Sequence, residues 1–317
     1  MHRFLRWYNQ NREIFFIGLA MIVFIFIIIQ VLNAIVGRPN EETGYNTEGN
    51  SSTNSTTISE PSTSVITGET MSEEETTSIT NTIKQFVEYC NNGEIENAYN
   101  MLTDECKTLI YPTIESFTQN YYQRIFYINR MYSLENWYDD GSLYTYYIKY
   151  TEDVLASGNL NSEDNKGDYI TVVETENDYR LNISSYVGRE MMNDKVNSDN
   201  IVITVNWLDM YMDYTIANLS VTNNRESDIS LDTKDGNYTM YMYDTNNVKY
   251  NSFVHENSEE QLRVRNGLTN TINIKFNKMY NPERELRGVI FSNVVLNYED
   301  YISGTSEKNS ITIKLEF

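Results

Sequence analysis

Residues 143–155 read LYTYYIKYTEDVL, and the hydrophobic pattern of the chain changes here from a helical repeat to an alternating one. Aromatic and β-branched residues predominate in this stretch, which is typical of a β-strand. A turn sequence, DDG at 139–141, precedes it. Two further strands are expected at 168–174 (DYITVVE) and 179–186 (YRLNISSY), and the polar residues at 176–178 predict that they form a hairpin.

Upstream of this stretch, apolar residues repeat at the spacing of a helix. The first stripe consists of Ile79, Ile83, Phe86, Val87 and Cys90, which fall on one face. The residues at 91–93 (NNG) tolerate the left-handed conformation that ends a helix. Shorter helical stretches follow to about residue 126, with Pro112 interrupting them. Helices followed by a curved antiparallel sheet predict an α+β domain.

The run at 83–110, IKQFVEYCNNGEIENAYNMLTDECKTLI, resembles the opening helices of the nuclear transport factor 2-like superfamily, especially its bacterial membrane-anchored branches. The pattern of that family is N/DG-D/E-x-x-x-A-Y/W-x-x-L-T/S, and the residues that match it are Gly93, Ala98, Tyr99, Leu102 and Thr103. The resemblance covers roughly residues 79–187. It implies a cone-shaped α+β domain with helices on a curved antiparallel sheet. Because this fold hosts enzymes, pockets and scaffolds alike, it implies little about function.

Short strands recur from residue 200 to residue 317 without a long helical stripe. They read IVITVNW, DYTIANLSV, YTMYMYD, TINIKF, GVIFSNVVLNY and SITIKLEF, and turn residues separate them. This pattern predicts a β-sandwich. The segment is similar to bacterial extracellular immunoglobulin-like domains of unknown function, in which a strand pair near a G-x-h-x-F sequence closes the sandwich, and Gly288, Val289 and Phe291 match that pattern loosely. The resemblance implies a location more than an activity.

The N-terminal part of the chain predicts a membrane anchor. Residues 14–36 contain no charged side chain, and as a helix they would be roughly 34 Å long, enough to cross a ~30 Å hydrocarbon core. Arg3, Arg6 and Arg12 precede the stretch, which predicts that the N-terminus is cytoplasmic. A cleaved signal peptide is the alternative, but the apolar run is too long for one. The expected localisation is the plasma membrane, single-pass, with the bulk of the chain extracytoplasmic.

Residues 37–78 are rich in Ser, Thr, Asn, Gly and Glu, which predicts a disordered linker. The expected organisation is therefore a cytoplasmic tail at 1–13, a transmembrane helix at 14–36, this linker, a nuclear transport factor 2-like domain at 79–187 and a sandwich at 200–317. The predicted fold class is α+β: an N-terminal transmembrane helix, a cone-shaped α+β domain, then an all-β immunoglobulin-like sandwich.

The amino-acid composition argues against several classes of function. The 317 residues include 45 Asp and Glu against 24 Lys and Arg, a formal net charge of −21, which argues against a nucleic-acid partner. Two His and two Cys make most His-dependent catalysis and a four-thiolate zinc site improbable. The acidic stretch at 161–168 lacks the glycine and the glutamate of a calcium loop. Phosphate-cradling and dinucleotide-binding motifs do not occur, so neither a cofactor nor a metal is expected.

Two pairs of alternatives concern individual residues. Cys90 and Cys106 lie on neighbouring apolar stripes, so they are either a disulfide between two helices or two buried thiols. A catalytic cysteine would need a basic partner, and His255 lies in the other predicted domain. Tyr99, Tyr121, Tyr122 and Tyr146 are candidate pocket-lining residues, with Asp104 as the nearest acid for chemistry of the ketosteroid-isomerase kind. Tyrosines at such spacings are more often core residues, and no enzyme is predicted.

The sequence thus predicts a non-enzymatic, membrane-anchored, extracytoplasmic binding or assembly protein of the bacterial cell envelope. Its partner would be an envelope protein or a small ligand. The alternatives are a glycan-binding module of the envelope, in which tyrosines would form a stacking platform, and an enzyme that uses the pocket of the cone domain.

Overall fold

The computed structural model describes residues 73–139, 141–152, 165–176, 178–233, 239–304 and 309–317. All of them belong to one compact unit of the chain, Ser55–Phe317. The predicted cytoplasmic tail, the predicted transmembrane helix and residues 37–72 of the predicted linker lie outside the described residues. The last residues of that linker, from Glu73 on, are the beginning of the first described helix.

Helix α3 spans Glu73–Asn91, and its predicted apolar stripe is its buried face. Gly93 follows with a φ of 75°, a left-handed conformation that glycine adopts without strain. The other helical segments before the first sheet are α4 (Ile95–Asn100), α5 (Asp104–Leu109), α6 (Ile114–Phe117), the π-helix η1 (Thr118–Tyr122) and α7 (Gln123–Ile125). Thr103 and Thr113 cap α5 and α6, because each hydroxyl accepts a hydrogen bond from a backbone N–H of the first turn.

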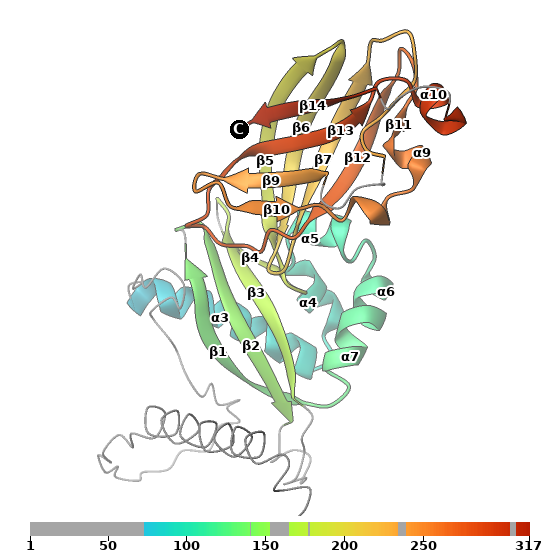
Figure 1. Cartoon of the computed structure of the whole chain (residues 1–317). Helices are drawn as coiled ribbons and strands as arrows, with labels where there is room; N and C mark the ends of the chain where they lie inside the picture. The colour runs from blue at the N-terminus through green and yellow to red at the C-terminus, as the bar shows by residue number, and fades with distance from the viewer. Residues whose placement is uncertain (1–72, 140, 153–164, 177, 234–238, 305–308) are drawn as a thin grey trace, which may run out of the picture. The chain divides into compact units, whose positions relative to one another are not determined.

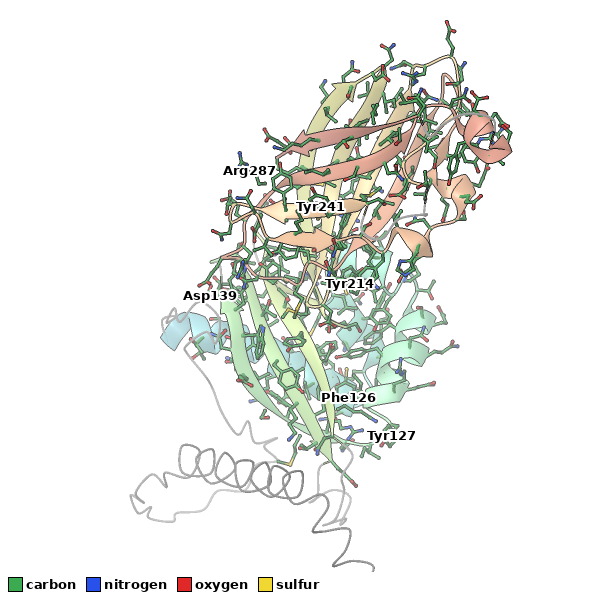
Figure 2. All side chains as sticks on the ribbon, in the orientation of Figure 1. Phe126, Tyr127, Asp139, Tyr214, Tyr241 and Arg287 are labelled. Carbon is green, nitrogen blue, oxygen red and sulfur yellow. The ribbon has the colours of Figure 1, made fainter. Side chains whose placement is uncertain are left out.

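Four antiparallel strands form the first sheet in the order β1-β2-β3-β4 (Figure 1). They are β1 (Arg130–Asp139), β2 (Leu143–Glu152), β3 (Lys166–Glu174) and β4 (Tyr179–Asn182). Helix α3 packs against β3 and β4. The side chains between the helices and this sheet form a first core that is rich in tyrosine and phenylalanine, and Figure 2 shows Phe126 within it.

Two further antiparallel sheets enclose a second core. One has the order β12-β7-β6-β5, and the other has the order β10-β9-β13-β8-β11 with β14 paired to β13. Their strands are β5 (Tyr186–Ser198), β6 (Ile201–Tyr211), β7 (Thr215–Asn223), β8 (Ile229–Ser230), β9 (Met240–Asp244), β10 (Lys249–Asn251), β11 (Arg263–Val264), β12 (Thr269–Phe276), β13 (Leu286–Val295) and β14 (Ser310–Glu316). Short helical segments η2 (Val254–Glu256), α9 (Glu259–Leu262) and α10 (Tyr298–Ser303) lie in the connections.

The first core also includes side chains from the sheet of β5, β6 and β7. Tyr186 and Tyr211 belong to it, with ring centroids 5.2 Å apart. Tyr214, labelled in Figure 2, packs against it and stacks on Tyr211 at 4.4 Å. The second core is separate and aliphatic, with Phe276 and Phe291 fully buried in it. The connection of β6 to β7 therefore contributes to the first core although its strands enclose the second.

The predicted fold class, α+β with an N-terminal transmembrane helix, is wrong. The described residues form a mostly β structure of three antiparallel sheets, and apart from α3 their helices are six residues or shorter. The helical stripes after residue 91 are divided by the turn at Gly93 and by the caps at Thr103 and Thr113. Two long strands, β1 and β5, were not predicted, because polar and charged residues interrupt the alternation of apolar residues in their sequences.

The membrane-related predictions are corrected as well. No helix among the described residues is both long enough and apolar enough to span a bilayer. Helix α3, the longest of them, carries charged and polar residues along its length. Residues 14–36, on which the predicted anchor depended, lie outside the described part of the chain. The single-pass anchor and the plasma-membrane localisation are therefore not supported.

Candidate functional site

The four tyrosines predicted to line a pocket lie in or on the first core. Tyr121 and Tyr146 are buried, whereas Tyr99 and Tyr122 are half-buried and pack against the core. The hydroxyl of Tyr99 donates to the carbonyl oxygen of Tyr111 over 2.9 Å. A hollow of about 550 Å³ beside α4 and α6 is lined by other residues. The pocket-lining role of the four tyrosines stays a prediction.

The two cysteines are free and buried in the first core. Burial raises the pKa of the Cys106 thiol to about 12 and raises that of Cys90 further. Both groups are therefore thiols rather than thiolates near neutral pH, which does not suit a nucleophile. His255 packs against Phe253, at a ring distance of 6.0 Å, outside this core. In the structure Cys90 and Cys106 are two unbridged thiols, which is the second alternative given by the sequence. A disulfide between them stays a prediction.

The buried acid of the first core is Asp168, not Asp104. The side chain of Asp104 is 99% exposed at the start of α5. Asp168 lies on β3, and its Oδ1 accepts hydrogen bonds from the backbone N–H groups of Tyr169 (2.8 Å) and Ser185 (3.1 Å). Its Oδ2 accepts from the N–H of Ser184 (2.9 Å). Ser184 and Ser185 have φ angles of 59° and 61°, so the carboxyl group holds two consecutive left-handed residues between β4 and β5.

Burial raises the pKa of Asp168 to about 6, although the surrounding N–H donors and the hydroxyl of Tyr121 favour its charged form. The hydroxyls of Tyr121 and Tyr150 lie 3.1 Å apart, and burial raises the pKa of each well above its usual value. A carboxylate has about four acceptor positions. Three backbone N–H groups occupy three of those positions on Asp168, so at most one acceptor is left for a substrate, and this arrangement fits a structural role.

A cleft of about 610 Å³ lies outside the first core. We use the name "the cleft" for this hollow, whose lining includes Tyr138, Arg189, Leu208, Lys278, Tyr280 and Phe317. The lining comes from strands β1, β2, β5, β6, β7 and β13, from the segment after β12 and from the last residue of the chain. The rings of Tyr138 and Tyr280 meet edge to face at 5.2 Å. A hollow of this volume, whose lining combines aromatic and apolar residues with charged ones, is within the size range of small-molecule sites.

Lys278 is the unusual residue of the cleft, because it is only 5% exposed. Its Nζ donates to the carbonyl oxygens of Met279 (3.1 Å) and Asn281 (3.5 Å), and no described carboxylate lies within ion-pair distance of it. Burial lowers the pKa of Lys278 to about 8; Arg284 acts in the same direction, while Asp244 and Glu190 oppose it. An ammonium group has three N–H donors, so one donor is left for a ligand.

The two arginines of the cleft are already paired. The guanidinium of Arg189 donates to Asp209 over 2.7 and 3.0 Å and lies 4.5 Å from the Trp207 ring centroid. Arg284 lies 3.5 Å from the carboxylate of Asp244. Burial alone would raise the pKa of Asp244, but hydrogen bonds, chiefly from the Tyr250 hydroxyl, hold it below its usual value. The positive charges of both arginines are thus balanced within the protein.

Three carboxylates of the cleft, by contrast, have no hydrogen-bond or ion-pair partner among the described residues. Glu190, Asp194 and Glu285 line it, and within the described ranges their side chains make neither a hydrogen bond nor an ion pair. Those ranges also contain no group of three His, Cys, Asp or Glu side chains arranged to hold a metal ion. The cleft therefore offers one buried ammonium donor and three free carboxylates beside an apolar and aromatic surface.

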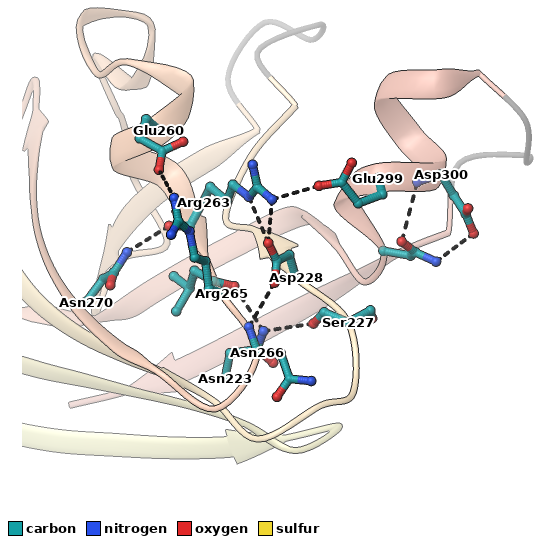
Figure 3. Close-up of polar contacts among 12 residues, drawn as sticks. Asn223, Ser227, Asp228, Glu260, Arg263, Arg265, Asn266, Asn270, Glu299 and Asp300 are labelled. Atoms are coloured by element: carbon teal, nitrogen blue, oxygen red, sulfur yellow. Dashed lines mark hydrogen bonds and ion pairs between the residues drawn. The ribbon is translucent and has the colours of Figure 1, made fainter.

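A second polar cluster lies at the other end of the sandwich strands and is shown in Figure 3. Arg263 donates to Asp228 over 2.9 and 2.5 Å and to Glu299 over 2.7 Å. The second oxygen of Asp228 accepts from the N–H of Asn266 over 2.9 Å. The guanidinium also lies 4.7 Å from the ring centroid of Tyr298. Every charge in this cluster is satisfied, so it ties β11 to α10 and to the segment before β8.

No family model, no curated protein and no solved structure matches the chain. The resemblances to the nuclear transport factor 2-like superfamily and to extracellular immunoglobulin-like domains, like the domain boundaries drawn from them, stay predictions. Sequence reasoning did not find Asp168 or Lys278 as site residues. The sequence gives little sign that Lys278 is buried. It lies two residues after the strand sequence TINIKF, and its burial depends on segments distant in the sequence.

Proposed function

We propose that the chain is a non-enzymatic binding protein whose cleft takes a small zwitterionic ligand, such as an amino acid or the terminal residue of a peptide. The observation that carries this proposal is the buried ammonium group of Lys278, which lines the cleft and has one N–H donor left over. A ligand carboxylate is the strongest acceptor for that donor, since a charge-assisted hydrogen bond is about twice as strong as a neutral one.

The rest of the lining suits the other parts of such a ligand. The unpaired carboxylates of Glu190, Asp194 and Glu285 can accept hydrogen bonds from a ligand ammonium group. The rings of Tyr138 and Tyr280 and the side chain of Leu208 offer an apolar surface to its side chain. The net charge of −21 favours the approach of a ligand that presents a positive group first.

The experiment is calorimetric titration of the full chain at neutral pH with free amino acids and dipeptides. Lys278→Met is expected to weaken binding about 10- to 100-fold, the effect of losing a charge-assisted hydrogen bond in a buried site. Lys249→Met is the matched control, because Lys249 is exposed on β10 and does not line the cleft. Equal affinity in the wild type and in Lys278→Met, or no binding by any zwitterion, would refute the proposal.

Glycan binding is a second candidate, supported by a different hollow. A groove of about 270 Å³ is lined by amide, hydroxyl and charged side chains and one methionine, together with Tyr89 and Tyr179. Gln85 and Asn97 are among these amides, and such planar donors and acceptors beside aromatic rings suit sugar hydroxyls. Titration with oligosaccharides should show binding that Tyr89→Ala removes and that Lys278→Met leaves unchanged. The opposite pattern would exclude this candidate.

A further inference from the structure

We propose that Lys278 is also an amine nucleophile, which forms an imine with an aldehyde or a 2-oxo acid that enters the cleft. This inference rests on the proposed function only in using the same cleft as its ligand site. It adds a chemical class of ligand, small carbonyl compounds, and a covalent step.

The backbone around Lys278 fixes the position of its side chain. The hydroxyl of Thr215 donates to the carbonyl oxygen of Lys278 over 3.0 Å, and the N–H of Tyr280 donates to the carbonyl oxygen of Met212 over 3.2 Å. The side chain is buried, yet it lines the 610 Å³ cleft. A nucleophile held in place at the wall of a hollow loses little orientational freedom when a carbonyl group approaches it.

The surroundings of Nζ permit the neutral amine. The hydrogen-bond acceptors of Nζ among the described residues are two carbonyl oxygens rather than a carboxylate, so no ion pair with them fixes the charge. Burial lowers the pKa of Lys278 to about 8, so about one molecule in ten has the neutral amine at pH 7, against roughly one in several thousand for an ordinary lysine. The negative charges of Asp244 and Glu190 oppose this shift without cancelling it.

The step balances without an oxidant or a reductant. The lone pair of Nζ attacks the carbonyl carbon, and the carbonyl oxygen takes up a proton as the carbon–nitrogen bond forms. The carbinolamine then loses its hydroxyl group, with the remaining Nζ proton, as water, and a carbon–nitrogen double bond is left. When that imine is protonated, its single N–H can donate to the carbonyl oxygen of Met279, which already accepts from Nζ over 3.1 Å. The Tyr250 ring, with its centroid 5.4 Å from Nζ, also favours a positive charge there.

Reductive trapping tests the inference. The full chain is incubated with pyruvate or propanal and sodium cyanoborohydride, and the labelled lysines are identified by peptide mass mapping. Lys278 is expected to be labelled about tenfold or more faster than exposed Lys249 near pH 7, because about one Lys278 side chain in ten is a neutral amine there. The ratio of the two rates should fall as the pH rises above 8, where Lys278 is largely neutral and gains little further reactivity, while the reactivity of ordinary exposed lysines still rises. Taking the ratio within one sample removes the pH dependence of the reagent.

Lys278→Arg is the matched variant, since it keeps the charge and removes the nucleophile, and its circular dichroism shows whether it folds. In this variant the labelling of Lys249 and Lys275 should be unchanged. Labelling of Lys278 no faster than that of Lys249, or a ratio that does not vary with pH, would overturn the inference. Zwitterion binding without selective labelling would refute the imine alone, and selective labelling without zwitterion binding would refute the proposed function alone.

Discussion

The protonation of Asp168 should make the folded chain more stable as the pH falls, which is opposite to the usual behaviour of a hydrogen-bonded aspartate. Burial raises its pKa to about 6 in the folded state, whereas an aspartate in an unfolded chain titrates near about 3.9. The stabilisation from the protonated form is therefore fully present below about pH 4 and is lost as the pH rises through about 6. The perturbation that isolates this effect is Asp168→Asn, which removes the titrating group and keeps its size.

The size of the effect follows from the two pKa values. Linkage between them gives about 2 kcal/mol of added stability for the wild type between about pH 7 and about pH 4.5. The asparagine variant loses stability at every pH, because its amide nitrogen faces the N–H of Ser184 or Ser185 instead of accepting from it. That loss is constant, so the change in the difference between the two proteins with pH is the quantity to measure.

Urea unfolding curves of both proteins at several pH values supply this difference. Asp104→Asn is the matched control, because that carboxylate is exposed and its removal should change the difference little. The reasoning is refuted if the wild type loses stability relative to Asp168→Asn as the pH falls. That result would mean that the three N–H donors outweigh burial and hold the pKa of Asp168 below its usual value.

Three other substitutions or treatments test the packing described above. Gly288→Ala should lower the free energy of unfolding in urea by about 1–3 kcal/mol, because the new Cβ would clash with the backbone of β14. Gly188→Ala should lower it by less than about 1 kcal/mol, because its Cβ would contact only methyl groups at 3.7 Å or more. Arg263→Ala should lower the free energy of unfolding by about 1–3 kcal/mol, because its charged hydrogen bonds are lost. Arg265→Ala, at an exposed position, should lower it by less than about 1 kcal/mol. Equal losses in the two variants would contradict this reasoning. The two cysteines should not react with a thiol reagent until the chain is unfolded, and rapid reaction of the native protein would contradict their burial.

The parts of the fold that local pattern determines were predictable. The stripe from Ile79 to Cys90 is confirmed as the buried face of α3, because five apolar residues at helical spacing have one face to occupy. The strand expected at 143–155 begins at Leu143 as β2, since its aromatic and β-branched residues suit a sheet. The expected strand that contains Gly288 is β13, and Gly288 lets the backbone of β14 approach it closely.

The parts that depend on distant segments were not predictable. Strand β5 reads YVGREMMNDKVNS, and its charged and polar residues conceal the alternation because one edge of the strand is not paired within its sheet. The hairpin strand expected at 179–186 ends at Asn182, since the carboxyl group of Asp168 holds the next turn in a left-handed conformation. Lys278 carries no local sign of burial, and neither does the carboxylate of Asp168. Contacts between residues distant in the sequence therefore determine the surroundings of both Lys278 and Asp168.

The shared tyrosines have a consequence for modularity. Tyr211 ends strand β6 and Tyr214 lies in the connection from β6 to β7, the strands that enclose the second core, yet both rings pack on the first core. A gene fragment that ended between residues 187 and 200 would lack both rings, and the remaining piece would expose aromatic surface that the intact chain covers. Neither the part of the chain before this point nor the part after it can therefore be transferred to another protein unchanged. A protein that reused one part alone would need different side chains where Tyr211 and Tyr214 contact the first core.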